Sequence, residues 1–396
     1  MPKPVSIIIP TLNGGDIFRQ CLEAIKNQEY DEEIQLIVID SGSQDESIIL
    51  AEKAGAQVIN INKKDFHHSR TRNHAVKLAK HEYIVLMVQD AIPTSNQWLS
   101  DLCNSLETDD VVAVYGVQVP HDDADLYSRY ELDCHQEYMG DMVKIQQVTS
   151  KILFNSMTYD EALLISRLDN VCAIYRRETL VQYPLPDIAY AEDLAWAKRV
   201  ILEGYKVKYD PKLKVKHSHS RSVDYRFRRA IVDTVYCAEI LERLSQDLSF
   251  VQYEQLLLVD KVIETQRKSI HQTFAINGGV TIKLGLFLYK FKKIIKRLKI
   301  INKVYRLMFF LQKKDSYGDP WLNGIAHTSG LHFQYILNDI KLRFPEASDE
   351  DLLISLDSVA AVLRGRIYGN VLASYRNAGY VPKELSNHIT HFMRGV

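Results

Sequence analysis

Along the first 116 residues, short runs of β-branched apolar residues alternate with stretches whose apolar positions recur at helical spacing. The runs predict strands, and the stretches between them predict amphipathic helices. This alternation is typical of an α/β fold, a mostly parallel sheet flanked by helices. We expect strands at Val5 to Ile9, Ile34 to Ile39, Gln57 to Asn60, Tyr83 to Val88 and Val111 to Tyr115, and helices near Ile17 to Asn27, Asp45 to Ala54 and Arg70 to Lys80.

The pattern changes twice further along the chain. Residues 117–170 are more polar and less regular, and two strands that flank a helix should then complete the sheet. These elements are expected at Val171 to Tyr175, about Ala191 to Glu203 and Val207 to Tyr209. From Tyr225 onward strand signals largely disappear, and helical periodicity runs from Arg226 to Arg267.

Residues 283–314, KLGLFLYKFKKIIKRLKIINKVYRLMFFLQKK, carry eleven Lys and Arg and no acid, interleaved with apolar residues at helical spacing. A basic amphipathic helix of this kind can lie at an anionic membrane surface, where each basic residue contributes about 1 kcal/mol. The alternative is a helix that packs on the rest of the protein with a solvated basic face. We favour the membrane surface.

We therefore predict three parts. Residues 1–225 form an α/β domain, residues 226–314 form a helical extension that ends in the basic segment, and residues 315–396 form a C-terminal helical domain. A helix in the last part should begin with Ser348 as its N-cap, since Asp351 follows three residues later.

The composition of the chain indicates the cellular compartment and excludes one class of binding partner. The 396 residues are 46% hydrophobic, enough for one large domain and smaller units. Because 49 Lys and Arg balance 50 Asp and Glu, we expect no nucleic-acid partner. The five scattered cysteines fit a reducing cytoplasm. No leader and no apolar run near the roughly 20 residues of a membrane span are seen, so we expect neither export nor membrane insertion.

Polar residues follow three of the predicted strands, at the carboxyl ends where open parallel sheets bind ligands. The three loops should converge, and their polar residues are Thr11 and Asn13, then Asp40 and Ser41, then Gln89 and Asp90. The turn from Thr11 to Gly15 lacks the spacing of a phosphate loop. The carboxylate of Asp40 could accept the imide N–H of uracil or thymine, or it could cap the next turn with Ser43. Asp90 could hold a divalent cation that bridges a diphosphate, or cap a helix.

Two further clusters of charged residues could bind a ligand or take part in catalysis. Residues 66–74 place two arginines and three histidines at a predicted helix start, where a pyrophosphate would be favoured, although a solvated basic helix start is the alternative. Glu192 and Asp193 lie at the start of another helix, where acids are usually partners of the helix dipole.

His217 and His219 form a His-x-His pair on an extended segment. Such a pair usually belongs to the polar surface rather than to a metal site. It becomes a candidate ligand set only if an acid such as Asp90 lies opposite it.

Six segments, in this order, resemble family 2 glycosyltransferases, which are nucleotide-diphosphosugar enzymes of the GT-A fold, and specifically their bacterial rhamnosyltransferase-like group. The segments are SIIIPTLNGG, LIVIDSGSQDES, FHHSRTRNHAV, MVQDAIP, AEDLAWAKRVILEGYKVKYDP and KHSHSRS, and they span about residues 4–225. The resemblance implies an α/β GT-A catalytic domain and an inverting glycosyltransferase.

The resemblance also implies residues for a nucleotide-sugar donor. Thr11, Asn13 and Asp40 would bind the nucleotide base and ribose. Ser41 and Gln89 lie in the same segments and join the donor-binding candidates. Arg72 would bind the diphosphate.

By the same resemblance, Asp90 would bind a divalent metal, Mn or Mg, with His217 or His219 completing its shell. The usual Asp-x-Asp metal motif appears here as Val88-Gln89-Asp90, and the rhamnosyltransferase-like members share the form Gln-Asp-Ala, here Gln89-Asp90-Ala91. With a single acid, a weaker metal site would leave more of the phosphate charge to Arg72.

Asp193 would be the catalytic base, which takes the proton of an acceptor hydroxyl as the hydroxyl attacks the anomeric carbon. Glu192 is the alternative base, but on a helix its side chain points about a hundred degrees away. A nucleotidyltransferase of similar fold should carry an arginine in the loop from Thr11 to Gly15, which has none. An inactive carbohydrate-binding or scaffold protein should show damage at Asp90, Asp193 or the histidine pair, and all are intact.

The basic segment indicates where the enzyme works. A protein held at the inner face of the cell membrane meets a polyprenyl-linked glycan acceptor at high local concentration. We therefore expect a cytoplasmic, peripheral membrane protein of bacterial surface polysaccharide or lipopolysaccharide synthesis. The resemblance favours dTDP-rhamnose as donor, with UDP-sugars as the main alternative. The helical C-terminus could make the protein a homo-oligomer.

Overall fold

The computed structural model describes residues 3–107, 110–277 and 319–394. The chain splits into two compact units. Unit 1 comprises Met1–Ser220 with Tyr236–Ser245, and unit 2 comprises Arg221–Val235 with Gln246–Val396. The predicted division into three parts stays a prediction, because its basic segment, residues 283–314, lies outside the described residues.

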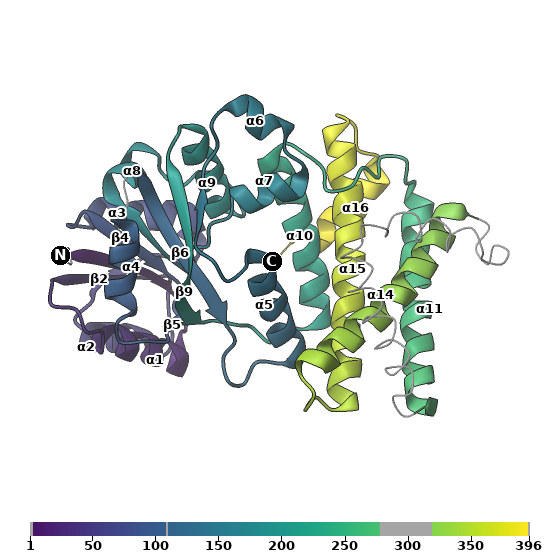
Figure 1. Ribbon diagram of the computed structural model, residues 1–396, viewed down its shortest axis with the longest axis horizontal. Coiled ribbons are helices and arrows are strands. Elements are labelled where there is room, and N and C mark those ends of the chain that lie inside the picture. Colours follow the sequence, from purple (N-terminus) through teal and green to yellow (C-terminus); the bar gives the residue numbers. More distant parts are fainter. Residues whose placement is uncertain (1–2, 108–109, 278–318, 395–396) are drawn as a thin grey trace. The chain divides into compact units, whose positions relative to one another are not determined.

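Unit 1 is built on a mixed, mostly parallel sheet (Figure 1). Among the described residues its nine strands are β1 Val5–Thr11, β2 Ile34–Asp40, β3 Gln57–Asn60, β4 Tyr83–Met87, β5 Ile92–Pro93, β6 Val111–Val119, β7 Lys144–Gln146, β8 Cys172–Arg176 and β9 Lys206–Lys216. Their order is β3-β2-β1-β4-β8-β6-β9-β5, and β7 pairs with β9. Strands β1 to β4 pair in parallel, whereas β8 runs antiparallel to both β4 and β6.

Helices cover both faces of this sheet. They are α1 Gly15–Lys26, α2 Ser47–Lys53, α3 His68–Leu78, α4 Trp98–Leu106, α5 Leu126–Met139, α6 Lys151–Ser156, α7 Tyr159–Ile165, α8 Arg177–Gln182 and α9 Glu192–Leu202, with a 3₁₀ turn, η1, at Lys63–Asp65. Ile7 packs in one apolar cluster with Phe18 of α1, and its neighbour Ile8 packs in a second cluster with Ala75 of α3 and Trp196 of α9. Both faces of β1 are buried, as its continuous apolar run predicts. The predicted α/β fold class, a mostly parallel sheet flanked by helices, is confirmed.

Two strands are longer than predicted. β6 continues past Tyr115 to Val119, and β9 continues past Tyr209 to Lys216. The register between them shifts, since Tyr115 pairs with Tyr209 but Val117 pairs with Lys214. Extra residues of β9 therefore bulge against Gly116, where a Cβ atom would lie 1.9 Å from the Leu213 carbonyl oxygen. The expected strand ends at Tyr115 and Tyr209 are wrong, because a bulge in a continuous strand carries the same polar signal as a turn.

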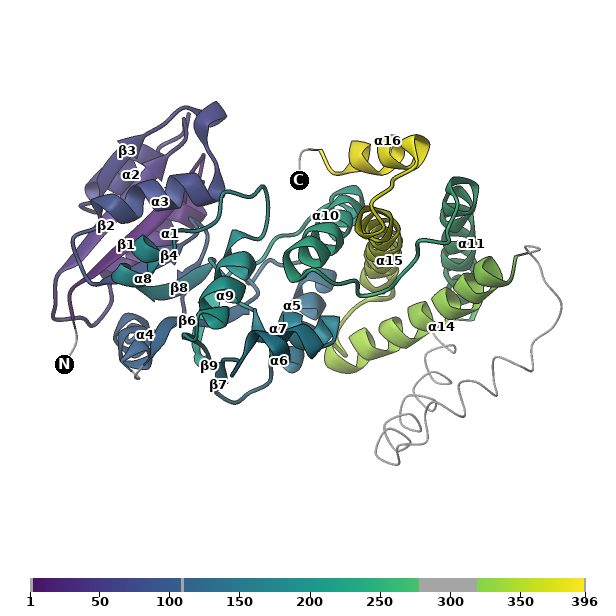
Figure 2. The same ribbon diagram turned by 90° about the horizontal axis from the view of Figure 1, so that it is seen from above.

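Unit 2 is helical (Figure 2). Its helices among the described residues are α11 Tyr253–Asn277, α14 Pro320–Arg343, α15 Asp349–Asn377 and α16 Lys383–Phe392, together with residues 223–235 of α10, which spans Val223–Leu241. α15 contacts α11, α14 and α16. Gly365 of α15 lets α10 approach closely, since a Cβ atom there would lie 2.4 Å from the carbonyl oxygen of Phe227. The helical C-terminal region is confirmed.

The continuous helical run predicted from Arg226 to Arg267 is wrong. α10 ends at Leu241, and Glu242 adopts a left-handed conformation with φ of 57° that stops the helix. The N-cap prediction is confirmed, because the Ser348 hydroxyl accepts from Asp351 N at 3.1 Å and Asp351 Oδ2 accepts from Ser348 N at 3.2 Å. Within the described residues we find no helix with the length and apolar character to cross a bilayer.

Candidate functional site

The loops after β1 and β2 are joined by their own hydrogen bonds. Asn13, at a left-handed φ of 48°, accepts from Gln44 N at 2.7 Å, and its own N–H donates to the Ser43 hydroxyl at 2.8 Å. Ser41 donates to the carbonyl oxygen of Thr11 through its backbone N–H at 3.0 Å and its hydroxyl at 3.1 Å. Thr11 and Ser41 are buried and Asn13 is exposed, so Asn13 is the side chain of these three that presents itself to solvent.

Asp40 caps the turn that follows it, which was the alternative interpretation of this residue. Its Oδ1 accepts from Gly42 N at 2.8 Å and Ser43 N at 2.9 Å, and its Oδ2 accepts from the Ser43 hydroxyl. The residue is buried at the end of β2. Because an ionised carboxylate has about four acceptor sites, these three bonds leave room for about one more.

Gln89 joins the third loop to the first. Its Oε1 accepts from the Thr11 hydroxyl at 2.6 Å and from Leu12 N at 2.8 Å, and its Nε2 donates to the Leu12 carbonyl oxygen at 3.3 Å. Gln89 therefore binds the protein's own backbone. The three polar loops converge at one edge of the sheet, as their positions after parallel strands predict.

A possible metal site lies at this edge. Asp90, just after β4, faces the histidine pair that follows β9, with Oδ1 3.7 Å from His217 Nε2 and Oδ2 3.6 Å from His219 Nε2. One ligand atom from each residue lies within 4.8 Å of the other two. The structure thus places an acid opposite the pair, the arrangement in which a His-x-His pair becomes a candidate ligand set. His121, which the sequence did not single out, bonds through Nε2 to the Asp90 carbonyl oxygen at 3.1 Å.

Asp193 lies in the first turn of α9, next to the start of β8. Its carboxylate accepts from Asn170 N at 3.1 Å and from Leu194 N at 2.8 Å. Burial, together with the negative charges of Glu192 and Asp169, raises the pKa of Asp193 to about 7. Such a carboxylate is suited to accept a proton near neutral pH. The preceding Ala191 is held at φ 57°, a left-handed conformation that is rare for alanine and typical of functional sites.

Arg72 lies against Glu192 in the interior. Its Nη1 is 3.3 Å from Glu192 Oε1 and donates to the His68 carbonyl oxygen at 3.2 Å, and both charged residues are buried. Within the described part of the chain its Nε has no hydrogen-bond partner. Arg70, the other arginine of the basic helix start, is exposed and pairs with Asp187 at 3.0 Å.

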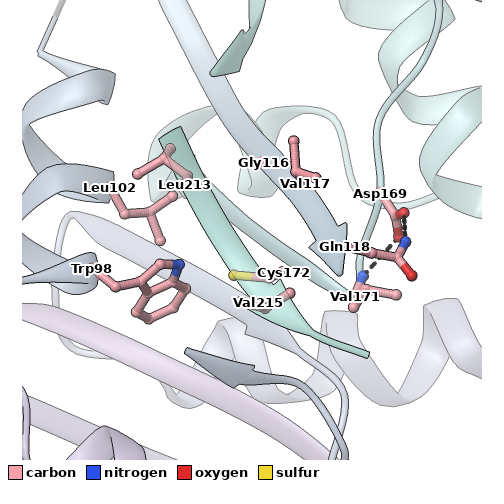
Figure 3. A pocket seen from close by; sticks show the side chains of 10 residues that line it. All are labelled: Trp98, Leu102, Gly116, Val117, Gln118, Asp169, Val171, Cys172, Leu213 and Val215. Carbon is pink, nitrogen blue, oxygen red and sulfur yellow. Dashed lines mark hydrogen bonds between the residues drawn. The ribbon is translucent and has the colours of Figure 1, made fainter. Parts of the chain in front are cut away.

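Besides His121, three polar residues of the site were missed by sequence reasoning, namely Gln118, Asp169 and Asn170. Gln118 at the end of β6 has its Oε1 2.7 Å from His217 Nδ1, and its Nε2 donates to Asp169. Asn170 contacts both acids of α9, through its N–H to Asp193 and through Nδ2 to Glu192 Oε1 at 3.2 Å. Gln118 and Asp169 line a small cavity whose other walls are mostly apolar (Figure 3). Its volume of about 10 Å³ suits about one water, so it is not the donor site.

Comparison with known proteins adds the family. Residues 6–182 match the family model described as Glycosyl transferase family 2. The chain is also 34% identical over 248 residues to the O-antigen chain rhamnosyltransferase RfbN of Salmonella typhimurium, which covers 60% of this chain and 74% of that protein. The chain belongs to glycosyl transferase family 2.

A second relative of this family 2 glycosyltransferase is the O-antigen chain rhamnosyltransferase WbaN of Salmonella anatum, 30% identical over 232 residues, 57% of this chain and 69% of the relative. Among solved structures, the chain is similar to the mannosyltransferase PcManGT from Pyrobaculum calidifontis in complex with GDP-Man and Mn2+, with a TM-score of 0.46, 15% identity and coverage of 96% of this chain and 86% of that one. The resemblance to family 2 is confirmed, and the protein is a glycosyltransferase. The family match ends at residue 182, before Asp193 and the histidine pair.

Proposed function

We propose that this enzyme transfers L-rhamnose from dTDP-rhamnose, with inversion, to a lipid-linked glycan acceptor in bacterial surface polysaccharide synthesis. One observation carries the transfer chemistry. A half-buried carboxylate with a raised pKa, Asp193, lies at the same sheet edge as the cluster of Asp90, His217 and His219. The first is the base that inverting transfer needs, and the second can hold the cation that a departing diphosphate needs.

The residues present fit a divalent metal. Asp90 offers carboxylate oxygens, and the two histidines offer one imidazole nitrogen each. Magnesium prefers oxygen ligands, whereas manganese accepts imidazole as well, so we propose Mn²⁺ rather than Mg²⁺. When bound, the ion supplies positive charge to the diphosphate as its bond to the sugar breaks.

For the donor, we propose that the exposed Asn13 meets the nucleotide while buried neighbours hold its loop. Thr11, Ser41 and Gln89 fix this loop by the hydrogen bonds described above, and Asp40 has about one acceptor site left for the base. Arg72 is proposed to reach the diphosphate through its unpartnered Nε. A buried donor without a partner costs about 1–3 kcal/mol, so a phosphate oxygen at this position would be favourable.

In the transfer step, the acceptor hydroxyl gives its proton to the carboxylate of Asp193 as its oxygen forms a bond to the anomeric carbon. The bond between that carbon and the diphosphate oxygen breaks on the opposite side, and the diphosphate leaves with the bonding electrons. One such displacement inverts the anomeric centre. Glu192 is excluded as the base in this proposal because its carboxylate is taken up by Arg72 and Asn170.

The sugar and acceptor proposals rest on the relatives and on the basic segment. Both relatives are named O-antigen chain rhamnosyltransferases, which supports rhamnose as the sugar and a surface polysaccharide as the setting. The eleven Lys and Arg of residues 283–314 support a cytoplasmic enzyme held at the anionic inner face of the membrane, where a polyprenyl-linked acceptor lies. Homo-oligomerisation through the helical C-terminus stays a prediction.

The test is release of free nucleotide from dTDP-, UDP- and GDP-sugars, with Mn²⁺, Mg²⁺ or a chelator and with a lipid extract as acceptor. We expect turnover of dTDP-rhamnose with Mn²⁺, loss of turnover with Asp193→Ala, and an inverted linkage by NMR of the product. Turnover of a UDP-sugar instead would replace the donor but keep the chemistry. No turnover of any donor would favour the inactive scaffold.

A further inference from the structure

A line of three polar side chains runs from the start of β8 to the proposed metal site. Asp169 accepts from Nε2 of Gln118, and Oε1 of Gln118 lies 2.7 Å from Nδ1 of His217. Nε2 of His217, the other ring nitrogen, lies 3.7 Å from Oδ1 of Asp90. We infer that Gln118 and Asp169 are positioning residues that hold His217 in the tautomer with the proton on Nδ1, so that Nε2 offers its lone pair to the metal.

The chemistry of the three groups fixes the direction of every bond. An ionised carboxylate only accepts, so the amide of Gln118 must turn its NH₂ group toward Asp169. The carbonyl oxygen of the amide then faces His217 and can only accept. Nδ1 must therefore carry the proton, and in the neutral ring Nε2 is left unprotonated, as a metal ligand requires.

The backbone holds both positioning residues in place. Gln118 lies on β6 and pairs in register with Val215 of β9, two residues before His217. His217 N donates to the Val119 carbonyl oxygen at 2.8 Å, and Asp169 is fixed by a bond from Val171 N at 3.0 Å. Figure 3 shows Gln118 and Asp169 facing each other across the end of the small cavity. The line is thus anchored at both ends by main-chain hydrogen bonds.

The two histidines are therefore unequal. The side chain of His217 is 12% exposed and that of His219 is 40% exposed. A ligand whose tautomer and ring orientation are set before binding loses less freedom when the metal arrives. The inference rests on the proposed metal site and adds to it that His217 is the preorganised histidine ligand.

The first test reads the tautomer without any metal. Long-range ¹H–¹⁵N spectra of ¹⁵N-histidine-labelled full-length protein at pH 8, with His217 assigned by its absence in His217→Gln, should show the Nδ1–H form. Gln118→Met removes the acceptor while keeping the size of the side chain, and it should convert His217 to a mixture of tautomers. An Nε2–H form of His217 in the wild type would overturn the inference.

The second test titrates Mn²⁺ by electron paramagnetic resonance of the free ion. Loss of the hydrogen-bond partner behind a metal ligand typically weakens metal binding about 10–100-fold, and we expect this range for Gln118→Met and for Asp169→Asn. Gln146→Met is the matched control, since Gln146 is a buried glutamine of the same unit whose amide donates to the carbonyl oxygens of Leu164, Ile165 and Arg167. The control should bind Mn²⁺ as the wild type does.

The outcomes separate the inference from the proposed function. Wild-type protein that binds no Mn²⁺ would overturn the metal site, and this inference with it. Wild-type binding together with unchanged affinity in a folded Gln118→Met would keep the metal site and overturn only the positioning role. If Gln118→Met does not fold, the tautomer of His217 in the wild-type protein, read by the first test, decides whether the inference stands.

Discussion

The hydroxyl of Thr11 lies 2.6 Å from Oε1 of Gln89. The same oxygen accepts from Leu12 N, while Nε2 of Gln89 donates to the carbonyl oxygen of Leu12. The side-chain amide of Gln89 thus both donates to and accepts from the backbone of one residue, Leu12, in the loop after β1. Gln89, next to Asp90 in the altered Asp-x-Asp motif, thus holds the loop after β1, and a carboxylate could not replace it because a carboxylate has no hydrogen-bond donor.

Gln89→Glu should therefore harm the enzyme although it makes the motif more acidic. The new carboxylate would face the carbonyl oxygen of Leu12, and neither of these two acceptors could donate a hydrogen bond to the other. We expect this to lower the free energy of unfolding by about 1–3 kcal/mol. We also expect a several-fold rise in the KM for the donor, because the loop that carries Asn13 loosens. Urea denaturation and steady-state kinetics measure both effects.

The control for this prediction is Gln182→Glu, the same chemical change on an exposed residue whose amide donates to the Tyr183 hydroxyl at 3.2 Å. It should leave stability and KM unchanged. Unchanged stability in Gln89→Glu together with tighter Mn²⁺ binding would contradict our interpretation and make position 89 a metal ligand.

The acidic limb of the pH–rate profile should report the protonation of Asp193. Because burial and two neighbouring acids raise its pKa to about 7, the base is protonated below that pH, and kcat/KM should fall about tenfold per pH unit there. Asp193→Asn should lose about 10²–10⁴ of the rate at pH 8. Protonation of the histidine ligands would give a similar limb, but saturating Mn²⁺ would move that limb and leave the Asp193 limb in place. A limb that disappears at high Mn²⁺ would argue against Asp193 as the titrating group.

Glu192→Gln should move this limb to lower pH. Glu192 carries a negative charge that raises the pKa of Asp193, so its removal lowers that pKa and keeps the base ionised in more acidic solution. The variant should also be less stable, since Arg72 would keep a buried charge without its carboxylate partner. Glu203→Gln, an exposed change at the other end of α9, should do neither. An unchanged limb in a folded Glu192→Gln would show that Asp193 does not sense this charge.

The local hydrophobic pattern was enough to predict most strands of the sheet and the polar residues that follow its parallel strands. β1, β2 and β4 are buried on both faces, so each forms a continuous apolar run, and the polar residues after them mark the edge where Asp40 and Asp90 lie. Local pattern could not show what these side chains bind. The bonds of Asp40 to its own turn were the local alternative, whereas Gln89 binds the loop after β1, which depends on how two loops meet in space.

The topology of the sheet explains why sequence reasoning missed Asp169 and Asn170. They precede β8, and β8 runs antiparallel to β4, with Cys172 opposite Met87. The start of an antiparallel strand lies at the edge where its parallel neighbours end, so residues before β8 join the site. Strand direction is set by tertiary pairing and is absent from the hydrophobic pattern. A search of both ends of each strand would have found them.

Gly116→Ala tests the bulge that leads β6 to Gln118. A Cβ atom at this position would lie 1.9 Å from the Leu213 carbonyl oxygen and 2.7 Å from the Leu213 Cβ, so the paired backbones of β6 and β9 would have to separate. We expect a loss of more than about 3 kcal/mol in the free energy of unfolding, which exceeds the usual cost of overpacking because the backbone itself must move.

Gly324→Ala is the opposite control, since Gly324 lies within α14 and a Cβ atom there would meet no neighbouring group within 4 Å among the described residues. Alanine should stabilise this helix by about 0.5–1 kcal/mol. Thermal denaturation compares the two variants, and a stable Gly116→Ala with intact Mn²⁺ binding would show that β9 can shift without disturbing the His217 end of the strand.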